Sequence, residues 1–155
     1  MDNSDIRQKL LVRQKGLTLL PNPKLIVDMY AGNGTISNLL WSHLNAKLIC
    51  IEKEQDKISN IDFCETICGN NVDYIELTKD ADVVDMDAYR LVMKPLKQVL
   101  EASTKTKLIF FTESNPFSKD INFTINQILK LDITCFWIEK CNYSNVFYGF
   151  VYKKR

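Results

Sequence analysis

Two glycines and two acidic residues near the start of the chain have the types and spacing of a site for a nucleotide-like ligand. Gly32 and Gly34 lie in the stretch LIVDMYAGNGTIS of residues 25–37, and Asp28 stands just before them. Because glycine has no side chain, a turn built from two of them lets the backbone pass close to a ligand. Glu52 follows the next apolar run, where a carboxylate can accept hydrogen bonds from both hydroxyls of a ribose. The pattern therefore predicts a ribose-containing ligand at the ends of these two runs.

Each of these features also has a purely structural interpretation. A Gly-x-Gly pair can serve only the backbone geometry of a strand-to-helix turn. Glu52 opens a charged run, residues 52–57, that is also consistent with a solvated strand end. The glycine turn and the acidic residue nevertheless occur together at the expected spacing, and this combination favours the ligand-binding interpretation.

Further polar residues follow two later apolar runs. Asp85 and Asp87 come after the apolar pair of residues 83–84. An unpaired carboxylate is costly in a sheet core, so we expect both to face a cleft. Two asparagines at residues 70–71 follow a short run, where their amides either read the edge of an adenine or form an ordinary turn.

These residues must be positioned by elements that alternate along the chain. Apolar runs predict strands around residues 25–27, 47–51, 65–68, 83–84, 107–111, 133–138 and 146–152. Spacing and capping residues predict helices over residues 5–15, 36–44, 55–63, 90–100 and 120–131. No helix-length segment separates the last two strands, so we expect them to form an antiparallel pair. The order predicts an α/β fold of seven strands.

Length and composition predict one globular domain. The chain has 155 residues, of which 46% are hydrophobic and 25% charged. We expect a single domain over residues 1–155, with an amino-terminal helix in residues 1–20 covering the sheet or the cleft and a core in residues 24–152. No apolar run approaches the roughly 20 residues that span a membrane, and the first residues carry no secretory signal. We therefore expect a cytoplasmic protein without a membrane segment.

The cysteines and the charges indicate less. Five cysteines and one histidine, His43, offer no spacing typical of a metal site, so we expect no metal and reduced thiols. The formal net charge is +1, but basic residues gather near both ends of the chain. They either contact phosphates of a nucleic acid or form a solvated helix face and tail, and the residues concerned are Arg7, Lys9, Arg13, Lys15, Lys24, Lys153, Lys154 and Arg155.

The combination of these stretches resembles a known family, the Rossmann-like class I S-adenosylmethionine-dependent methyltransferases. VDMYAGNGT is similar to the glycine-rich first motif of that family, ICIE to its acidic second strand end, and DVVDMDAY to its strand-four motif. The resemblance covers residues 24–152. It implies a single-domain fold with a seven-stranded, mostly parallel sheet, an antiparallel terminal hairpin strand and helices on both faces. It also implies S-adenosylmethionine as the cofactor and S-adenosylhomocysteine as its product.

The same resemblance assigns residues to the cofactor. Asp28 and the backbone of the glycine turn would hold the methionine part, Glu52 the ribose, and the asparagines of residues 70–71 the adenine. The complete set of implied cofactor-binding residues is Asp28, Tyr30, Ala31, Gly32, Asn33, Gly34, Glu52, Lys53, Asn70, Asn71 and Asp85.

The strand-four stretch also suggests a substrate. It looks like the Asp-x-Asp-Pro-Tyr/Phe pattern of tRNA guanine-N2 methyltransferases and, more loosely, the motif of enzymes that methylate exocyclic amines of bases. The implied catalytic residues are Asp85, Asp87 and Tyr89, with Asp87 accepting from the amine and Tyr89 stacking on the base. This chain departs from the pattern at Ala88, where the family has proline.

We therefore expect methylation of a base amine in RNA or DNA. The chain is short for such an enzyme, so target recognition would use a homo-oligomer or a partner subunit. Two alternatives stay open. One is a methyltransferase acting on a small molecule or a protein, and the other is a non-catalytic methyltransferase-like scaffold or partner-dependent subunit.

Overall fold

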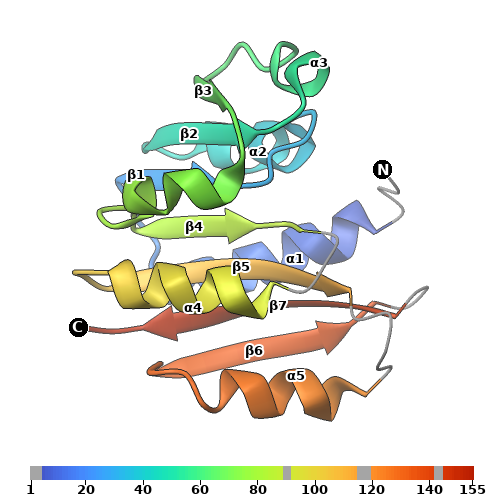
Figure 1. The fold of residues 1–155 in the computed structure, drawn as a ribbon, viewed down its shortest axis with the longest axis vertical. Helices are drawn as coiled ribbons and strands as arrows, with labels where there is room; N and C mark the ends of the chain where they lie inside the picture. The colour runs from blue at the N-terminus through green and yellow to red at the C-terminus, as the bar shows by residue number, and fades with distance from the viewer. Residues whose placement is uncertain (1–4, 89–91, 115–119, 142–144) are drawn as a thin grey trace.

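The fold is that of a computed structural model, which describes residues 5–88, 92–114, 120–141 and 145–155. Its centre is one seven-stranded sheet with the strand order β3-β2-β1-β4-β5-β7-β6 (Figure 1). The strands are β1 Leu25–Asp28, β2 Lys47–Glu52, β3 Glu65–Cys68, β4 Val83–Met86, β5 Lys107–Ser114, β6 Cys135–Lys140 and β7 Val146–Lys153. Strands β1 to β5 pair in parallel, and β7 runs antiparallel to both β5 and β6. The predicted fold class is thereby confirmed.

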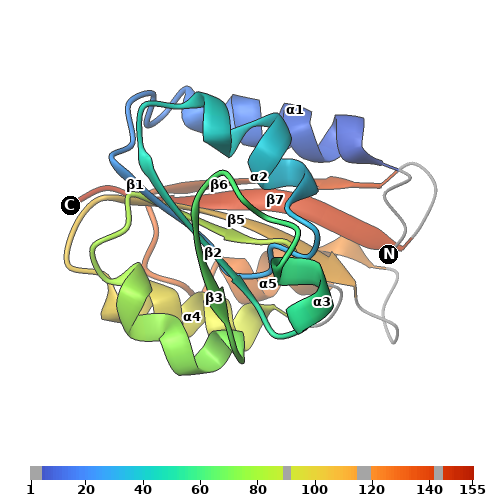
Figure 2. The same ribbon diagram turned by 90° about the horizontal axis from the view of Figure 1, so that it is seen from above.

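Helices cover both faces of this sheet. The α-helices are α1 Ile6–Leu17, α2 Thr35–Leu39, α3 Gln55–Ile58, α4 Met93–Ala102 and α5 Ile121–Ile128, and the 3-10 helices are η1 Trp41–His43 and η2 Asn71–Thr78. Figure 2 shows α1 and α2 over one face of the sheet and α4 over the opposite face. Each face has its own apolar core because successive strand residues point to opposite sides. Val27 of β1 belongs to the core under α4, and its neighbour Ile26 belongs to the core under α1.

The strands predicted from the sequence agree with the structure better than the predicted helix lengths do. The helix expected to reach Leu44 ends at Leu39, because Leu40 leaves the helical region with φ −130° and a separate 3-10 turn follows. The helix expected over residues 55–63 ends at Ile58, since its mostly polar sequence offers little apolar surface to pack. The sixth strand is Cys135–Lys140 rather than residues 133–138, because its register is fixed by pairing with β7.

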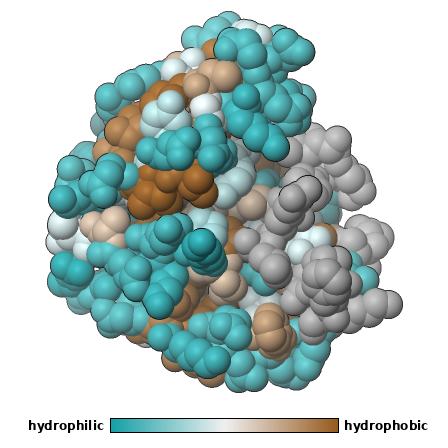
Figure 3. Space-filling model, viewed as in Figure 1, coloured by the Kyte–Doolittle hydropathy of each residue, from teal (hydrophilic) through white to brown (hydrophobic). Residues whose placement is uncertain are grey.

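One element was not expected. The asparagines of residues 70–71 were expected either to contact an adenine or to form an ordinary turn, but no helix was expected here, and η2 starts at Asn71 and continues to Thr78. It packs against α4, and its side chains Val72 and Leu77 are exposed. Figure 3 shows apolar residues exposed among polar ones on the face of the molecule that is seen in Figure 1.

Within the described ranges, no helix has the length and apolarity that a membrane crossing requires.

Candidate functional site

The glycine turn lies at the carboxyl end of β1, directly before α2. Gly32 has φ 55° and Gly34 has φ 73°, values that side-chain-bearing residues rarely adopt. A Cβ atom on Gly34 would lie 2.9 Å from Cγ1 of Ile61, so the turn also packs too closely for alanine. The Ala31 N–H donates to the Ile51 carbonyl of β2 at 3.1 Å, which fixes the turn between the two strands.

Glu52 at the end of β2 reaches this turn. Its Oε2 accepts from the Gly32 N–H at 2.9 Å, and its Oε1 accepts from the Glu54 N–H at 3.1 Å. The side chain is buried beside the turn. Each carboxylate oxygen has a second lone pair, so the group retains acceptor capacity for hydroxyl donors. Glu52 therefore lies next to the glycine turn, as the spacing of these residues along the sequence predicted.

Asp28 lies beneath the same turn and has an unusual ionisation. Its Oδ2 accepts from the Ser37 hydroxyl at 2.6 Å, and its Oδ1 accepts from the Tyr30 N–H at 3.2 Å. Burial, together with the nearby charge of Asp85, raises the pKa of Asp28 to about 8. The carboxyl group is therefore mostly protonated at neutral pH, and a positive ligand placed beside it would favour its ionised form.

Asp85 of β4 was expected to face a cleft, but this prediction is wrong, because α1 covers the side chain and Arg13 pairs with it. Arg13 donates to both of its carboxylate oxygens, through Nε at 2.6 Å and Nη2 at 2.7 Å. The indole N–H of Trp41 donates to Oδ2 at 2.9 Å. Asp85 is fully buried, so in this arrangement its carboxylate holds α1 against the sheet beneath the site.

Asp87, just beyond β4, is paired but less enclosed. Lys9 of α1 donates to its two oxygens at 2.9 and 2.8 Å, and the Thr112 hydroxyl donates to Oδ1 at 2.5 Å. Burial alone would raise the pKa of Asp87, but the charges of Arg13 and Lys9 outweigh it and hold the pKa below its ordinary value. Asp87 is therefore a carboxylate at neutral pH, with a side chain 13% exposed.

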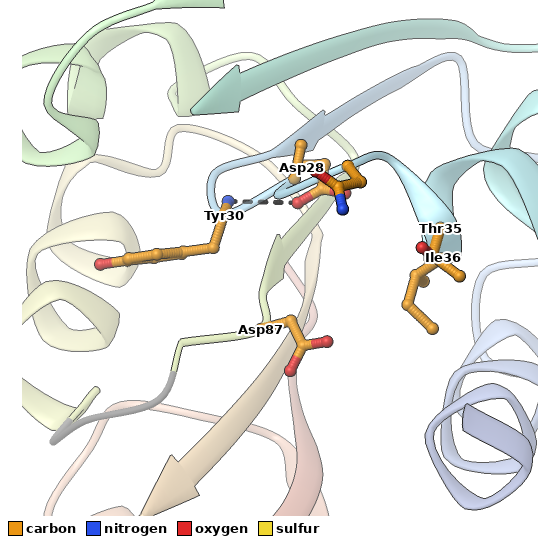
Figure 4. Close-up of a pocket in the computed structure, with 7 residues that line it drawn as sticks. Asp28, Tyr30, Thr35, Ile36 and Asp87 are labelled. Atoms are coloured by element: carbon orange, nitrogen blue, oxygen red, sulfur yellow. Dashed lines mark hydrogen bonds between the residues drawn. The ribbon is translucent and has the colours of Figure 1, made fainter. Parts of the chain in front are cut away.

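Asp28 and Asp87 line one shared recess, called here the Asp28–Asp87 recess. Its cavity volume is small, about 20 Å³, and the recess opens to solvent. Figure 4 shows Asp28 and Tyr30 on one side, the start of α2 on another, and Asp87 below them. The complete lining is Asp28, Tyr30, Ala31, Asn33, Thr35, Ile36 and Asp87. Predicted cofactor residues and a predicted acceptor residue thus open into the same space.

The other predicted residues that the structure describes do not line this recess. Lys53 and Asn70 are exposed, and Asn71 is buried with its side-chain amide donating to the Met29 carbonyl. Tyr89 lies outside the described residues, so its predicted stacking role stays a prediction. The roles of the other residues in binding also stay predictions.

Lys9 and Arg13 are the most important residues that sequence reasoning placed elsewhere. They were assigned either to phosphate contacts or to a solvated helix face, yet both are buried, and they bind Asp85 within β4 and Asp87 just beyond it. Their spacing of four along a helix, opposite two carboxylates that need partners, was the available signal. Ser37 and Thr112 were also missed, because isolated hydroxyl residues carry no recognisable pattern.

Comparison with solved structures shows the same fold in methyltransferases. The chain is similar to the proposed methyltransferase yhhF from Escherichia coli, with 13% identity, TM-score 0.68, and coverage of 99% of this chain and 87% of the other. The plantazolicin methyltransferase BpumL in complex with SAH has 13% identity and a TM-score of 0.69, and the match covers 95% of this chain and 83% of BpumL. An rRNA methylase from Streptococcus thermophilus has 11% identity and a TM-score of 0.64, and the match covers 86% of this chain and 89% of the methylase. No protein-family model matches the sequence, and no curated protein matches it either. The chain therefore has a Rossmann-like methyltransferase fold.

Proposed function

We propose that this chain is an S-adenosylmethionine-dependent methyltransferase. The observation that carries the proposal is the Asp28–Asp87 recess, in which cofactor-side groups and an acceptor-side carboxylate face one space at the carboxyl ends of β1 and β4. Open α/β sheets bind their ligands at this edge. The fold shared with BpumL, which was solved with SAH, supports the same choice of ligand.

The groups present fit this cofactor. Glu52 offers carboxylate acceptors for ribose hydroxyls, and the glycine turn offers a surface without side chains at a positive φ. Asp28 offers a buried carboxyl group that a positive charge would stabilise in its ionised form. When bound, S-adenosylmethionine supplies an electrophilic methyl group on a positively charged sulfur.

The contribution of the protein to such a transfer is mainly positioning. Asp87 accepts a hydrogen bond from the attacking amine, and Lys9 and Thr112 hold its carboxylate ionised and in a fixed direction. Fixing the acceptor atom in line with the methyl group supplies most of the acceleration available in such a displacement. No strong base is required if the amine attacks through its neutral lone pair.

The proposed acceptor is a base amine in RNA or DNA. The position of Asp87 in the strand-four stretch supports it, and so does the likeness to an rRNA methylase. Target recognition would then rest on a homo-oligomer or a partner subunit. The burial of Lys9 and Arg13 favours a second candidate, a small molecule or a protein, because these two cations cannot contact phosphates.

A labelled-methyl transfer assay tests this proposal. The purified chain is incubated with S-adenosylmethionine carrying a radioactive methyl group and with RNA, single-stranded DNA, a peptide mixture or a small-molecule extract. Transfer to RNA or DNA that is lost in Asp87→Asn supports the base-amine proposal. Transfer only to peptides or small molecules selects the second candidate. If the chain binds the cofactor but transfers no labelled methyl group to any of these four substrate mixtures, the enzyme proposal is contradicted and the scaffold alternative is left.

A further inference from the structure

Two cysteine thiols are in contact beside the site. Sγ of Cys64 lies 3.4 Å from Sγ of Cys50, and both cysteines are free. Cys50 lies in β2 and Cys64 immediately precedes β3, and both side chains belong to the core under α1 and α2. A disulfide has an S–S distance of about 2.05 Å, so an approach of roughly 1.4 Å would join them.

The two thiols differ in accessibility and in ionisation. Cys64 is partly exposed, whereas Cys50 is completely buried. The hydrogen bond between the sulfurs lowers the pKa of Cys64 and raises the pKa of Cys50. Cys64 is therefore the more accessible of the two thiols and the one that ionises more readily, with a second thiol already next to it.

A chain of hydrogen bonds connects this pair to the Asp28–Asp87 recess. The Cys50 thiol donates to the Ser37 hydroxyl oxygen at 3.4 Å. The Ser37 hydroxyl in turn donates to Asp28 at 2.6 Å. A change at Cys50 therefore acts on the hydroxyl group that holds the Asp28 carboxyl.

We propose that Cys50 and Cys64 form a peroxide-reactive dithiol that closes to an intramolecular disulfide. The Cys64 thiolate attacks one oxygen of hydrogen peroxide, the O–O bond breaks, and the products are a sulfenic acid and hydroxide. Cys50 sulfur then attacks the Cys64 sulfur, so that the S–S bond forms and the S–O bond breaks. The hydroxyl group leaves as water with the Cys50 proton. Overall, two thiols are oxidised and one peroxide molecule is reduced to two waters.

The disulfide removes the S–H group that Cys50 gives to Ser37. The Ser37 oxygen then loses its sulfur donor, and the Cys50 sulfur shifts toward Cys64. Oxidation of the partly exposed Cys64 thereby changes the hydrogen bonding on the Asp28 side of the recess. The chemistry of the pair needs no cofactor, so its test is independent of the proposed methyltransferase function.

Mass spectrometry of the full chain tests the proposal. The reduced protein is treated with hydrogen peroxide, denatured, alkylated with iodoacetamide and mapped as peptides. We expect Cys50 and Cys64 to lose alkylation together, one peptide pair to be linked between them, and dithiothreitol to restore both thiols. Cys68→Ser is the matched control, because Cys68 is exposed four residues further along and should leave the cross-link unchanged.

Two variants separate the steps. Cys64→Ser should leave Cys50 open to alkylation after peroxide, since the attacking thiol is missing. Cys50→Ala should accumulate a Cys64 sulfenic acid, which dimedone traps, because the second thiol is missing. Full alkylation of both cysteines in the wild-type chain, at peroxide doses that oxidise the exposed Cys135, would overturn the proposal. A disulfide mapped to any other pair of cysteines would overturn it as well.

Discussion

The guanidinium of Arg13 donates to both carboxylate oxygens of Asp85, and each of these side chains is 1% exposed. This pair joins α1 to the end of β4 across the face of the sheet. Breaking a buried ion pair by removing one partner typically costs about 3 to 5 kcal/mol, because the other charge stays buried and unpaired. The amino-terminal helix α1 therefore stabilises the end of β4 on which the site is built.

The first prediction concerns this pair. Arg13→Met should lower the free energy of unfolding by about 3 kcal/mol or more. Arg7→Met changes an exposed residue of the same helix and should stay within about 0.5 kcal/mol of the wild type. Urea denaturation measures both. The double variant Arg13→Met with Asp85→Asn should recover part of the loss, and a loss under about 1 kcal/mol in Arg13→Met alone would show that Asp85 needs no partner.

The second prediction concerns the pH dependence contributed by Asp28. Its pKa is about 8 in the folded chain and has the ordinary value of 3.8 when unfolded, so folding takes up a proton between these values. The stability that Asp28 contributes is complete below about pH 3.8 and is lost as the pH rises through about 8. The uptake of one proton on folding lowers the free energy of unfolding by about 1.4 kcal/mol for each unit that the pH rises.

Comparison with Asp28→Asn isolates this contribution. Between pH 5 and pH 7.5, the free energy of unfolding of the wild type should fall relative to that of Asp28→Asn. Titrating groups far from Asp28 are common to both proteins and cancel in the difference. Parallel pH profiles of the two proteins, measured by urea denaturation, would mean that Asp28 is already ionised in the folded chain.

The third prediction concerns Asp87. Asp87→Asn should lower methyl transfer by about 100-fold or more, because a positioned acceptor contributes on that scale. The affinity for S-adenosylhomocysteine should change much less, since Asp87 lies on the acceptor side of the recess. Asp56→Asn alters an exposed aspartate of α3 and should retain wild-type transfer. A rate in Asp87→Asn equal to that of the wild type would remove Asp87 from the reaction.

The parts of the site that sequence reasoning predicted are local. The apolar run of β1, the glycines at positive φ and the acidic end of β2 each follow from a few neighbouring residues. Parallel pairing of β1 with β2 then brings Glu52 to the turn without further information. The seven-stranded order with an antiparallel β7 followed from the same alternation of elements.

The parts that were missed depend on contacts between distant residues. Lys9 and Asp87 are separated by 78 positions, and Arg13 and Asp85 by 72. Nothing in the neighbourhood of either aspartate specifies which helix covers it. The short α2 and the unexpected η2 had weak local signals, because their lengths are set by packing rather than by propensity.

The measurement that tests the central claim most directly is the affinity of the wild-type chain and Glu52→Gln for S-adenosylhomocysteine, by isothermal titration calorimetry. The account predicts binding to the wild type, no binding of NAD, and at least a roughly tenfold loss in Glu52→Gln, which is about 1.4 kcal/mol. Glu54→Gln is the matched control, because the Glu54 side chain pairs with Lys57 at the surface, and it should bind as the wild type does. No binding to the wild type at millimolar ligand, or equal affinities for wild type and Glu52→Gln, would contradict the account.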